Sequence, residues 1–234
     1  GDVLVVSSGA TANATLAGAW TATASSSNDG TANLTAAGFA VNLAAASGAN
    51  GWSVSNAGNS TGVSLTGSAR ADTLVGGTGS DSLSGGAGND GLDGGAGNDT
   101  LTGGAGADSF NISAGTDRIT DLGTGSDVLV VSSGATANAA LAGAWTAASN
   151  SSNNGTANLT AAGFAVNLAA ATGTNGWSVS NAGNSTGVSL TGSAKADTLI
   201  GGTGADSLSG GDGNDSLNGG AGNDTLTGGA GADS

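Results

Sequence analysis

The feature that most constrains this chain is a nine-residue pattern that repeats without interruption. From Gly76 to Asn111 the sequence reads GGTGSDSLS GGAGNDGLD GGAGNDTLT GGAGADSFN, and the pattern returns from Gly201 to Ser234. Every complete block has the form G-G-x-G-x-D-x-U-x, where U is a large apolar residue. A unit this short buries its apolar residue only by stacking on its neighbours, so the repeat predicts an all-β solenoid.

Each fixed position of the nonamer has a chemical reason. Glycines at the first, second and fourth positions permit positive φ and tight turning, which brings backbone carbonyls together. The aspartate at position six adds a hard anionic oxygen, and Ca²⁺ prefers roughly six to eight oxygen ligands. A solvated acidic edge without metal would not need glycine at three fixed places. The nonamer therefore predicts several Ca²⁺ ions between stacked turns, over a core of Leu83, Leu92, Leu101 and Phe110.

If each nonamer is half a turn, aspartates eighteen residues apart stack on one edge. Asp72, Asp90 and Asp108 then line one side, and Asp81, Asp99 and Asp117 line the other. The predicted metal ligands are the position-six carboxylates Asp72, Asp81, Asp90, Asp99, Asp108, Asp117, Asp127, Asp197, Asp206, Asp215, Asp224 and Asp233. Backbone carbonyls are expected to join them near Gly77, Gly79, Gly86, Gly88, Gly95, Gly97, Gly104, Gly106, Gly202, Gly204, Gly211, Gly213, Gly220, Gly222, Gly229 and Gly231.

Charge and composition exclude several classes of function. The chain has 17 acidic residues against three basic ones, a net charge of −14, so it cannot neutralise nucleic-acid phosphates. It has no cysteine and no histidine, and Lys195 is its single lysine, which excludes Ser–His, Cys–His and Schiff-base catalysis within these residues. We expect no enzyme here, no catalytic residue, no organic cofactor and no membrane insertion, since no apolar run reaches about eighteen residues.

A longer period of 125 residues contains the first. Residues 1–109 and 126–234 differ at 14 of 109 positions, and Trp20, Phe39 and Trp52 recur as Trp145, Phe164 and Trp177. We interpret residues 1–125 as one repeat unit and residues 126–234 as most of a second. Each unit divides into a strand-rich segment (3–66, 128–191) and a nonapeptide segment (67–121, 192–234). The array is expected to be a fragment of a longer chain.

The strand-rich segments alternate apolar and polar residues, as in FAVNLA at Phe39 and WSVS at Trp52, which indicates half-buried strands. We predict wider coils of the same solenoid that run into the nonapeptide coils without a linker. Ala12–Ala24 would also tolerate a helix, but its Thr and Trp residues favour a strand. Trp20, Trp52 and Phe39 are expected to pack in the core or cover a flank of the solenoid.

The nonapeptide segment begins and ends irregularly. GSARADTLV at Gly67 has Ser68 and Arg70 where glycine is expected, so Asp72 either closes the first site or caps the stack. ISAGTDRIT at Ile112 keeps few fixed positions. The pattern then recovers one residue late at Asp127, whose equivalent in the first unit is Asp2.

These nonamers resemble the RTX (haemolysin-type) calcium-binding repeats of Gram-negative bacteria. The resemblance is strong over residues 67–127 and 192–234. Residues 3–66 resemble such proteins only in their general style of sequence. It implies a right-handed parallel β-roll or β-helix, export by type I secretion, and folding outside the cell on meeting Ca²⁺. We expect the chain to be disordered in chelator and β-rich in millimolar Ca²⁺, because a highly acidic chain with a small-residue core collapses poorly alone.

Three functions fit. The first is an extracellular structural array (a surface layer, a filament or an adhesin stalk) whose 125-residue repeat adds length and which self-associates. The second is the folding and secretion module of a toxin or enzyme whose catalytic domain lies elsewhere. The third is an ice- or glycan-binding surface. Thr78 and Thr203 stand alone at position three, which weakens this interpretation, but a flat rank of Thr66, Thr73 and Thr100 stays open. The repetition favours the first.

Overall fold

The computed structural model describes residues 2–234, and these residues form strands, turns and bends but no helix. They divide into two compact units, Gly1–Asp117 and Arg118–Ser234. Strands in each unit pair in parallel with strands of the next coil, about one turn further along the chain. The predicted all-β parallel solenoid is confirmed for each unit.

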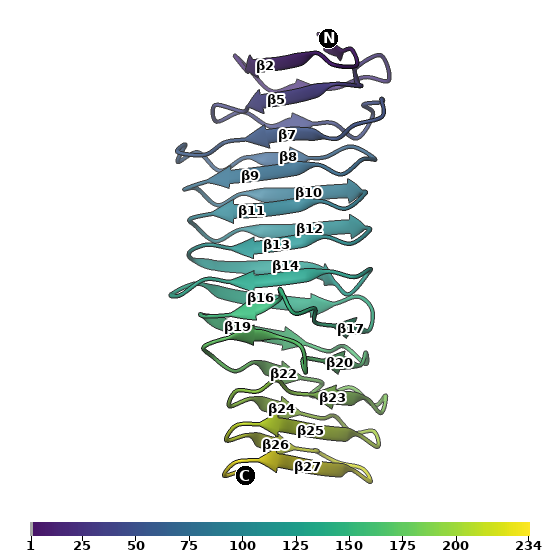
Figure 1. Ribbon diagram of the computed structural model, residues 1–234, viewed down its shortest axis with the longest axis vertical. Helices are drawn as coiled ribbons and strands as arrows, with labels where there is room; N and C mark the ends of the chain where they lie inside the picture. Colours follow the sequence, from purple (N-terminus) through teal and green to yellow (C-terminus); the bar gives the residue numbers. More distant parts are fainter. Residues whose placement is uncertain (1) are drawn as a thin grey trace. The chain divides into compact units, whose positions relative to one another are not determined.

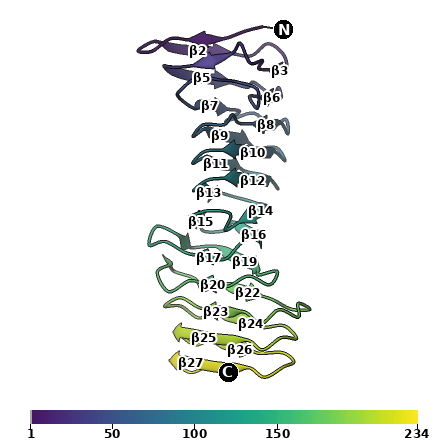
Figure 2. The same cartoon turned by 90° about the vertical axis from the view of Figure 1, so that its right-hand side faces the viewer.

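In the first unit the strands form two long faces, which Figures 1 and 2 show, and one short face. One face contains β2 (Thr11–Thr15), β5 (Thr31–Thr35), β7 (Trp52–Ser55), β9 (Thr73–Gly77), β11 (Gly91–Gly95) and β13 (Ser109–Ile112). The second contains β3 (Trp20–Thr21), β6 (Val41–Asn42), β8 (Ser64–Thr66), β10 (Ser82–Ala87) and β12 (Thr100–Ala105). The short face is β1 (Val5–Val6) with β4 (Ser27–Asn28), and β14 (Thr116–Leu122) contains the boundary between the units.

The second unit repeats this plan. Its short face contains β15 (Val128–Val131), β18 (Ser152–Asn153) and β21 (Thr172–Gly173). One long face contains β16 (Thr136–Leu141), β19 (Thr156–Thr160), β22 (Ser178–Ser180), β24 (Thr198–Ile200) and β26 (Ser216–Asn218). The other contains β17 (Trp145–Thr146), β20 (Val166–Asn167), β23 (Ser189–Thr191), β25 (Ser207–Asp212) and β27 (Thr225–Ala230).

The coils are of two kinds. In the nonapeptide segments a turn contains two strands, and paired residues lie 18 apart, as in Ser82 with Thr100. In the strand-rich segments a turn contains three strands, and paired residues lie 20–24 apart, as in Thr11 with Thr31 and Val41 with Leu65. The predicted wider coils are therefore three-sided. They join the tight coils directly, because Ser64 of β8 pairs with Ser82 of β10.

Inward residues of neighbouring coils form continuous apolar ranks. Leu65, Leu83 and Leu101 lie side by side on β8, β10 and β12, and all are at most 1% exposed. The facing rank consists of Val54, Leu74, Leu92 and Phe110, which are equally buried. Alternate residues of a strand point to opposite faces, so these ranks are the core and the intervening Ser and Thr lie outside.

In the strand-rich segments the predicted strands are present. Ala12–Ala24 contains β2 and β3 rather than a helix. Trp52 is 1% exposed and lies edge-on to Trp20, with ring centroids 6.0 Å apart, whereas Phe39 is 38% exposed on a turn. Core packing is therefore confirmed for Trp52, and Phe39 lies on the flank.

The threonine rank that the sequence left open, Thr66, Thr73 and Thr100, does not form. Thr66 pairs with Ser84, Thr100 pairs with Ser82, and Thr73 lies on the other face of the solenoid. Their strands place them in different columns, because register rather than composition decides which side chains align. The threonines that do align are in the wide coils, where Thr11 pairs with Thr31 and Thr15 with Thr35.

Candidate calcium sites

The position-six aspartates stack in two rows in the first unit, one on each edge. The backbone N–H of Asp72 donates to Asp90 Oδ1 at 2.7 Å, and that of Asp90 donates to Asp108 Oδ1 at 2.9 Å. On the other edge Asp81 donates to Asp99 at 2.8 Å, and Asp99 to Asp117 at 3.0 Å. Each carboxylate thus bonds to the coil before it, and the two rows lie as the eighteen-residue spacing predicts.

The second unit contains the same rows. Asp197 donates to Asp215 Oδ1 at 2.8 Å and Asp215 to Asp233 at 3.0 Å, while Asp206 donates to Asp224 at 2.9 Å on the opposite edge. Ten of the twelve predicted ligands are buried, Asp224 is half-buried and Asp233 is exposed.

Burial changes the titration of these carboxyls. The pKa of Asp90 is raised to about 7, mainly because burial removes the hydration of its carboxylate. The backbone hydrogen bond from Asp72 lowers this pKa, and the negative charges of Asp72 and Asp108 raise it. Burial likewise raises the pKa of Asp117 to about 7, with contributions from Asp99 and Asp93. A row of ionised carboxylates in such surroundings is costly unless a cation compensates for the lost solvation.

The glycines have two different roles, and the expectation of positive φ at all three positions is partly wrong. In the turn of residues 85–90, Gly86 and Gly88 have φ of +110° and +120°, a region that side chains disfavour. Gly85, at position one, does not have positive φ. It is required because a Cβ there would meet Asp90 Oδ2 and would lie 2.6 Å from the Gly103 carbonyl oxygen.

The position-two and position-four carbonyls form rows beside the carboxylates. A Cβ on Gly104 would meet the Gly86 carbonyl oxygen, and a Cβ on Gly106 would meet the Gly88 carbonyl oxygen. The same contact recurs in the second unit, where the Gly211 carbonyl faces Gly229. The predicted carbonyls thus stack from coil to coil at the same edges as the aspartates.

The aspartate turns differ in whether the second carboxylate oxygen, Oδ2, accepts a hydrogen bond. In turns 85–90, 94–99, 112–117 and 210–215, the Oδ2 atoms of Asp90, Asp99, Asp117 and Asp215 are buried and have no hydrogen-bond partner. We call these open turns. In turns 67–72, 76–81, 192–197 and 201–206, the N–H at position two donates to Oδ2 at 2.5–2.7 Å. We call these closed turns.

The open turns fit a calcium ion. A buried carboxylate oxygen without a donor needs either a proton or a cation, and the carbonyl rows add neutral oxygens of the kind Ca²⁺ prefers. The chain's three basic side chains, Arg70, Arg118 and Lys195, are all exposed. Asp90, Asp99, Asp117 and Asp215 are the residues that would hold the ion, together with carbonyls of position two and position four.

Among residues 2–234, no three acidic side chains cluster in a way that would hold a metal alone. That carboxylates and glycine carbonyls hold Ca²⁺ together stays a prediction.

The predicted ligand Asp127 and its equivalent in the first unit, Asp2, lie differently. Asp127 is buried, and its Oδ2 accepts the position-two N–H of Gly123 at 2.7 Å, as in the closed turns. Asp2 is exposed, and its backbone carbonyl accepts the Trp20 indole N–H at 3.1 Å.

Several polar residues that stabilise the edges were missed from the sequence. The Ser68 N–H donates to Asp72 Oδ2 at 2.5 Å, and its hydroxyl donates to the same oxygen at 2.9 Å. Buried Asn28 and Asn56 bond backbone groups of the wide coils. A signal existed for Ser68, because the same serine replaces glycine at the equivalent Ser193.

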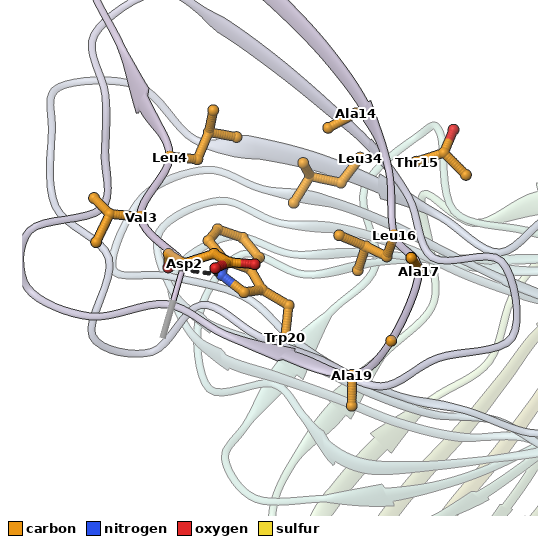
Figure 3. A pocket seen from close by; sticks show the side chains of 11 residues that line it. Asp2, Val3, Leu4, Ala14, Thr15, Leu16, Ala17, Ala19, Trp20 and Leu34 are labelled. Atoms are coloured by element: carbon orange, nitrogen blue, oxygen red, sulfur yellow. Dashed lines mark hydrogen bonds between the residues drawn. The ribbon is translucent and has the colours of Figure 1, made fainter.

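The largest cavity described in the first unit, about 450 Å³, lies away from the aspartate rows. Figure 3 shows Leu4, Leu16 and Leu34 around the same hollow as the Trp20 ring. Among the described residues, Asp2 is the only acidic one that lines it, so it is no calcium site. A helix long and apolar enough to cross a membrane is also not found among residues 2–234.

Comparison with known families agrees with this geometry. A model of the RTX calcium-binding nonapeptide repeat matches the chain four times, at residues 66–101, 92–119, 189–217 and 200–234. The chain therefore carries RTX calcium-binding repeats, built here into parallel β-roll coils, and RTX repeats bind Ca²⁺. Searches of curated proteins and of solved structures found no match.

Proposed function

We propose that this chain is an extracellular structural repeat protein, in which calcium between the coils folds and stiffens a module of a surface layer, filament or adhesin stalk. The 125-residue repeat carries the proposal. Two units with 14 differences in 109 positions duplicate the same coils, which adds length and cation sites rather than new chemistry.

Calcium would enter as the partner of the buried carboxylates. Asp90 and Asp99 lie on opposite edges, and each has one oxygen that accepts a backbone N–H and one that accepts no hydrogen bond. Extracellular Ca²⁺ modules bind with Kd of about 10⁻⁴–10⁻³ M. A site with calcium at about ten times its Kd adds about 1.4 kcal/mol of stability. Secretion by a type I route and an extracellular location belong to this proposal.

The proposal assigns no catalysis to these residues. Histidine and cysteine do not occur, and the buried aspartates bond to backbone groups in regular rows instead of lining a cleft. An RTX folding and secretion module of a larger toxin or enzyme is the alternative, with its catalytic residues in another domain. Such modules do not need a duplicated 125-residue unit.

One observation favours a second candidate, an ice- or glycan-binding face. On β2 and β5 the exposed Thr11 and Thr15 align with Thr31 and Thr35, and Asn33 Nδ2 donates to Asn13 Oδ1 at 2.8 Å. Asn158 and Asn138 repeat the bond at 2.9 Å. Ice recrystallisation and glycan-array binding test this candidate directly.

Self-association is the part of the proposal that distinguishes an array from a secretion module. Unpaired strand edges of a β-solenoid invite pairing with another chain. Electron microscopy of the purified chain in EDTA, in millimolar Mg²⁺ and in millimolar Ca²⁺ tests it. We expect filaments or sheets only with Ca²⁺. Dispersed monomers in Ca²⁺ would favour the secretion module instead.

A further inference from the structure

The closed and open turns follow an order along the chain. In each unit the first aspartate turn on either edge is closed, and the turns that follow, ending at Asp90, Asp99 and Asp215, are open. The closed turns end at Asp72 and Asp81 in the first unit and at Asp197 and Asp206 in the second. The same order in both units indicates a feature of the fold.

In the closed turns both oxygens of the carboxylate accept hydrogen bonds. The Asp72 carboxylate accepts the Trp52 N–H at 2.6 Å, the Ser68 N–H at 2.5 Å and the Ser68 hydroxyl at 2.9 Å. Asp197 accepts the same three groups from Trp177 and Ser193, at 2.6, 2.6 and 3.0 Å. Asp81 accepts backbone N–H groups of Val63 and Gly77, both at 2.7 Å.

The backbone of the closed turns differs in the same way. Gly77 and Gly79 do not have positive φ, whereas Gly86 and Gly88 at the same positions of the next turn along the chain do. Glycine is present in both, so composition does not decide the conformation. Gly77 and Gly79 lie against residues 59–62 of the wide coil, which also bonds Thr78 through the Asn59 carbonyl.

The neighbouring wide coil explains the difference. Ser53 pairs with Thr73 and Ser64 with Ser82, so Trp52 lies opposite Asp72 and Val63 lies opposite Asp81. An ion between two coils would find one carboxylate there instead of two. Buried polar side chains of the first unit's wide coils are neutral, namely Ser26, Asn28 and Asn56.

We propose that the four closed turns at the start of the nonapeptide segments, which end at Asp72, Asp81, Asp197 and Asp206, are metal-free caps. The calcium rows would then begin at the second turn on each edge, and the wide coils with their caps would fold without calcium. The inference rests on the proposed calcium-dependent function and narrows it. The wide coils would be a preformed template on which calcium orders the following nonapeptide coils. In chelator, only these nonapeptide coils would then be disordered, and not the whole chain.

The test compares two matched double variants of the full chain. D72N/D197N alters closed turns, and D90N/D215N alters the next turn on the same edges; all four carboxylates are buried and bond a backbone N–H of the preceding coil. Bound Ca²⁺ per chain is measured by equilibrium dialysis. D72N/D197N should keep the wild-type number, and D90N/D215N should lose one ion or more in each unit. Equal losses would overturn the inference.

Hydrogen exchange of the wild-type chain tests the same point without a substitution. In EDTA, amides of residues 5–82 and 128–207 should stay protected, and those of 85–117 and 210–234 should become protected only with Ca²⁺. Fast exchange in EDTA across 64–82 would overturn the inference even if calcium binds normally. A wild-type chain that bound no Ca²⁺ would overturn both the proposed function and this inference. Normal Ca²⁺ binding with fast exchange across 64–82 would overturn the inference alone, so the two failures can be told apart.

Discussion

At the scale of residues, Gly86 shows how closely the coils approach at the calcium edges. Its φ is +110°, and a Cβ there would meet the Ser68 carbonyl oxygen of the coil before it. Gly91 lies only a few residues further on, without positive φ, and a Cβ there would meet no atom within 4 Å. The conformation of Gly86 therefore requires glycine, whereas nothing in the surroundings of Gly91 does.

We expect Gly86→Ala to lower the free energy of unfolding by about 1–3 kcal/mol from backbone strain, with a further loss from the Ser68 contact. Gly91→Ala is the control. The equivalent position in the second unit is Ser216, so the change should stay within about 0.5 kcal/mol. Urea unfolding in saturating calcium measures both. Equal effects would mean that Gly86 is not held in its left-handed conformation.

At the scale of elements, the three-sided coils depend on a few large side chains. Trp52 on β7 and Trp177 next to β22 are each 1% exposed, among many small residues. The ring centroids of Trp52 and Trp20 are 6.0 Å apart, and so are those of Trp177 and Trp145. A narrow core of Ala, Val and Leu gains much of its buried apolar area from such rings.

Trp52→Ala should lower the free energy of unfolding by about 3–5 kcal/mol, because it removes a fully buried ring. The loss should appear in EDTA as well as in calcium, since the described wide coils of the first unit contain no buried carboxylate. Phe39→Ala, at a residue that is 38% exposed, is the matched control and should have little effect. Thermal unfolding followed by tryptophan fluorescence and circular dichroism measures them. A Trp52→Ala effect confined to calcium-containing buffer would contradict this account.

At the scale of the whole molecule, the balance between carboxylates and cations controls stability. The net charge is −14, and buried aspartates stack in rows in both units. Burial raises the pKa of Asp72, Asp99 and Asp197, and it raises the pKa of Asp90 and Asp117 to about 7. In the unfolded chain the pKa of Asp90 and Asp117 is near 3.9, about three units lower than in the folded chain.

Without calcium, stability should therefore fall as the pH rises from about 4 to 7, because over this range the folded chain binds more protons than the unfolded chain. Above pH 7 the cost of the ionised rows is fully present. Calcium should reverse the trend, since protons compete with it for the same oxygens. Melting temperatures at pH 5 and pH 8, in EDTA and in saturating calcium, test both signs. A higher melting temperature at pH 8 in EDTA would be the contrary result.

The sequence by itself determined the tight coils, the inward leucines such as Leu83 and Leu92, and the two aspartate rows. A nine-residue period forces equivalent residues into equivalent surroundings, and a period of eighteen then aligns Asp72 with Asp90. The tertiary structure alone decided that the wide coils have three sides and that the turns ending at Asp72 and Asp81 are closed. Both features depend on the neighbouring coil, in which Trp52 and Val63 occupy the position of the aspartate. These contacts join residues about twenty apart in the chain. The nine-residue pattern does not encode them.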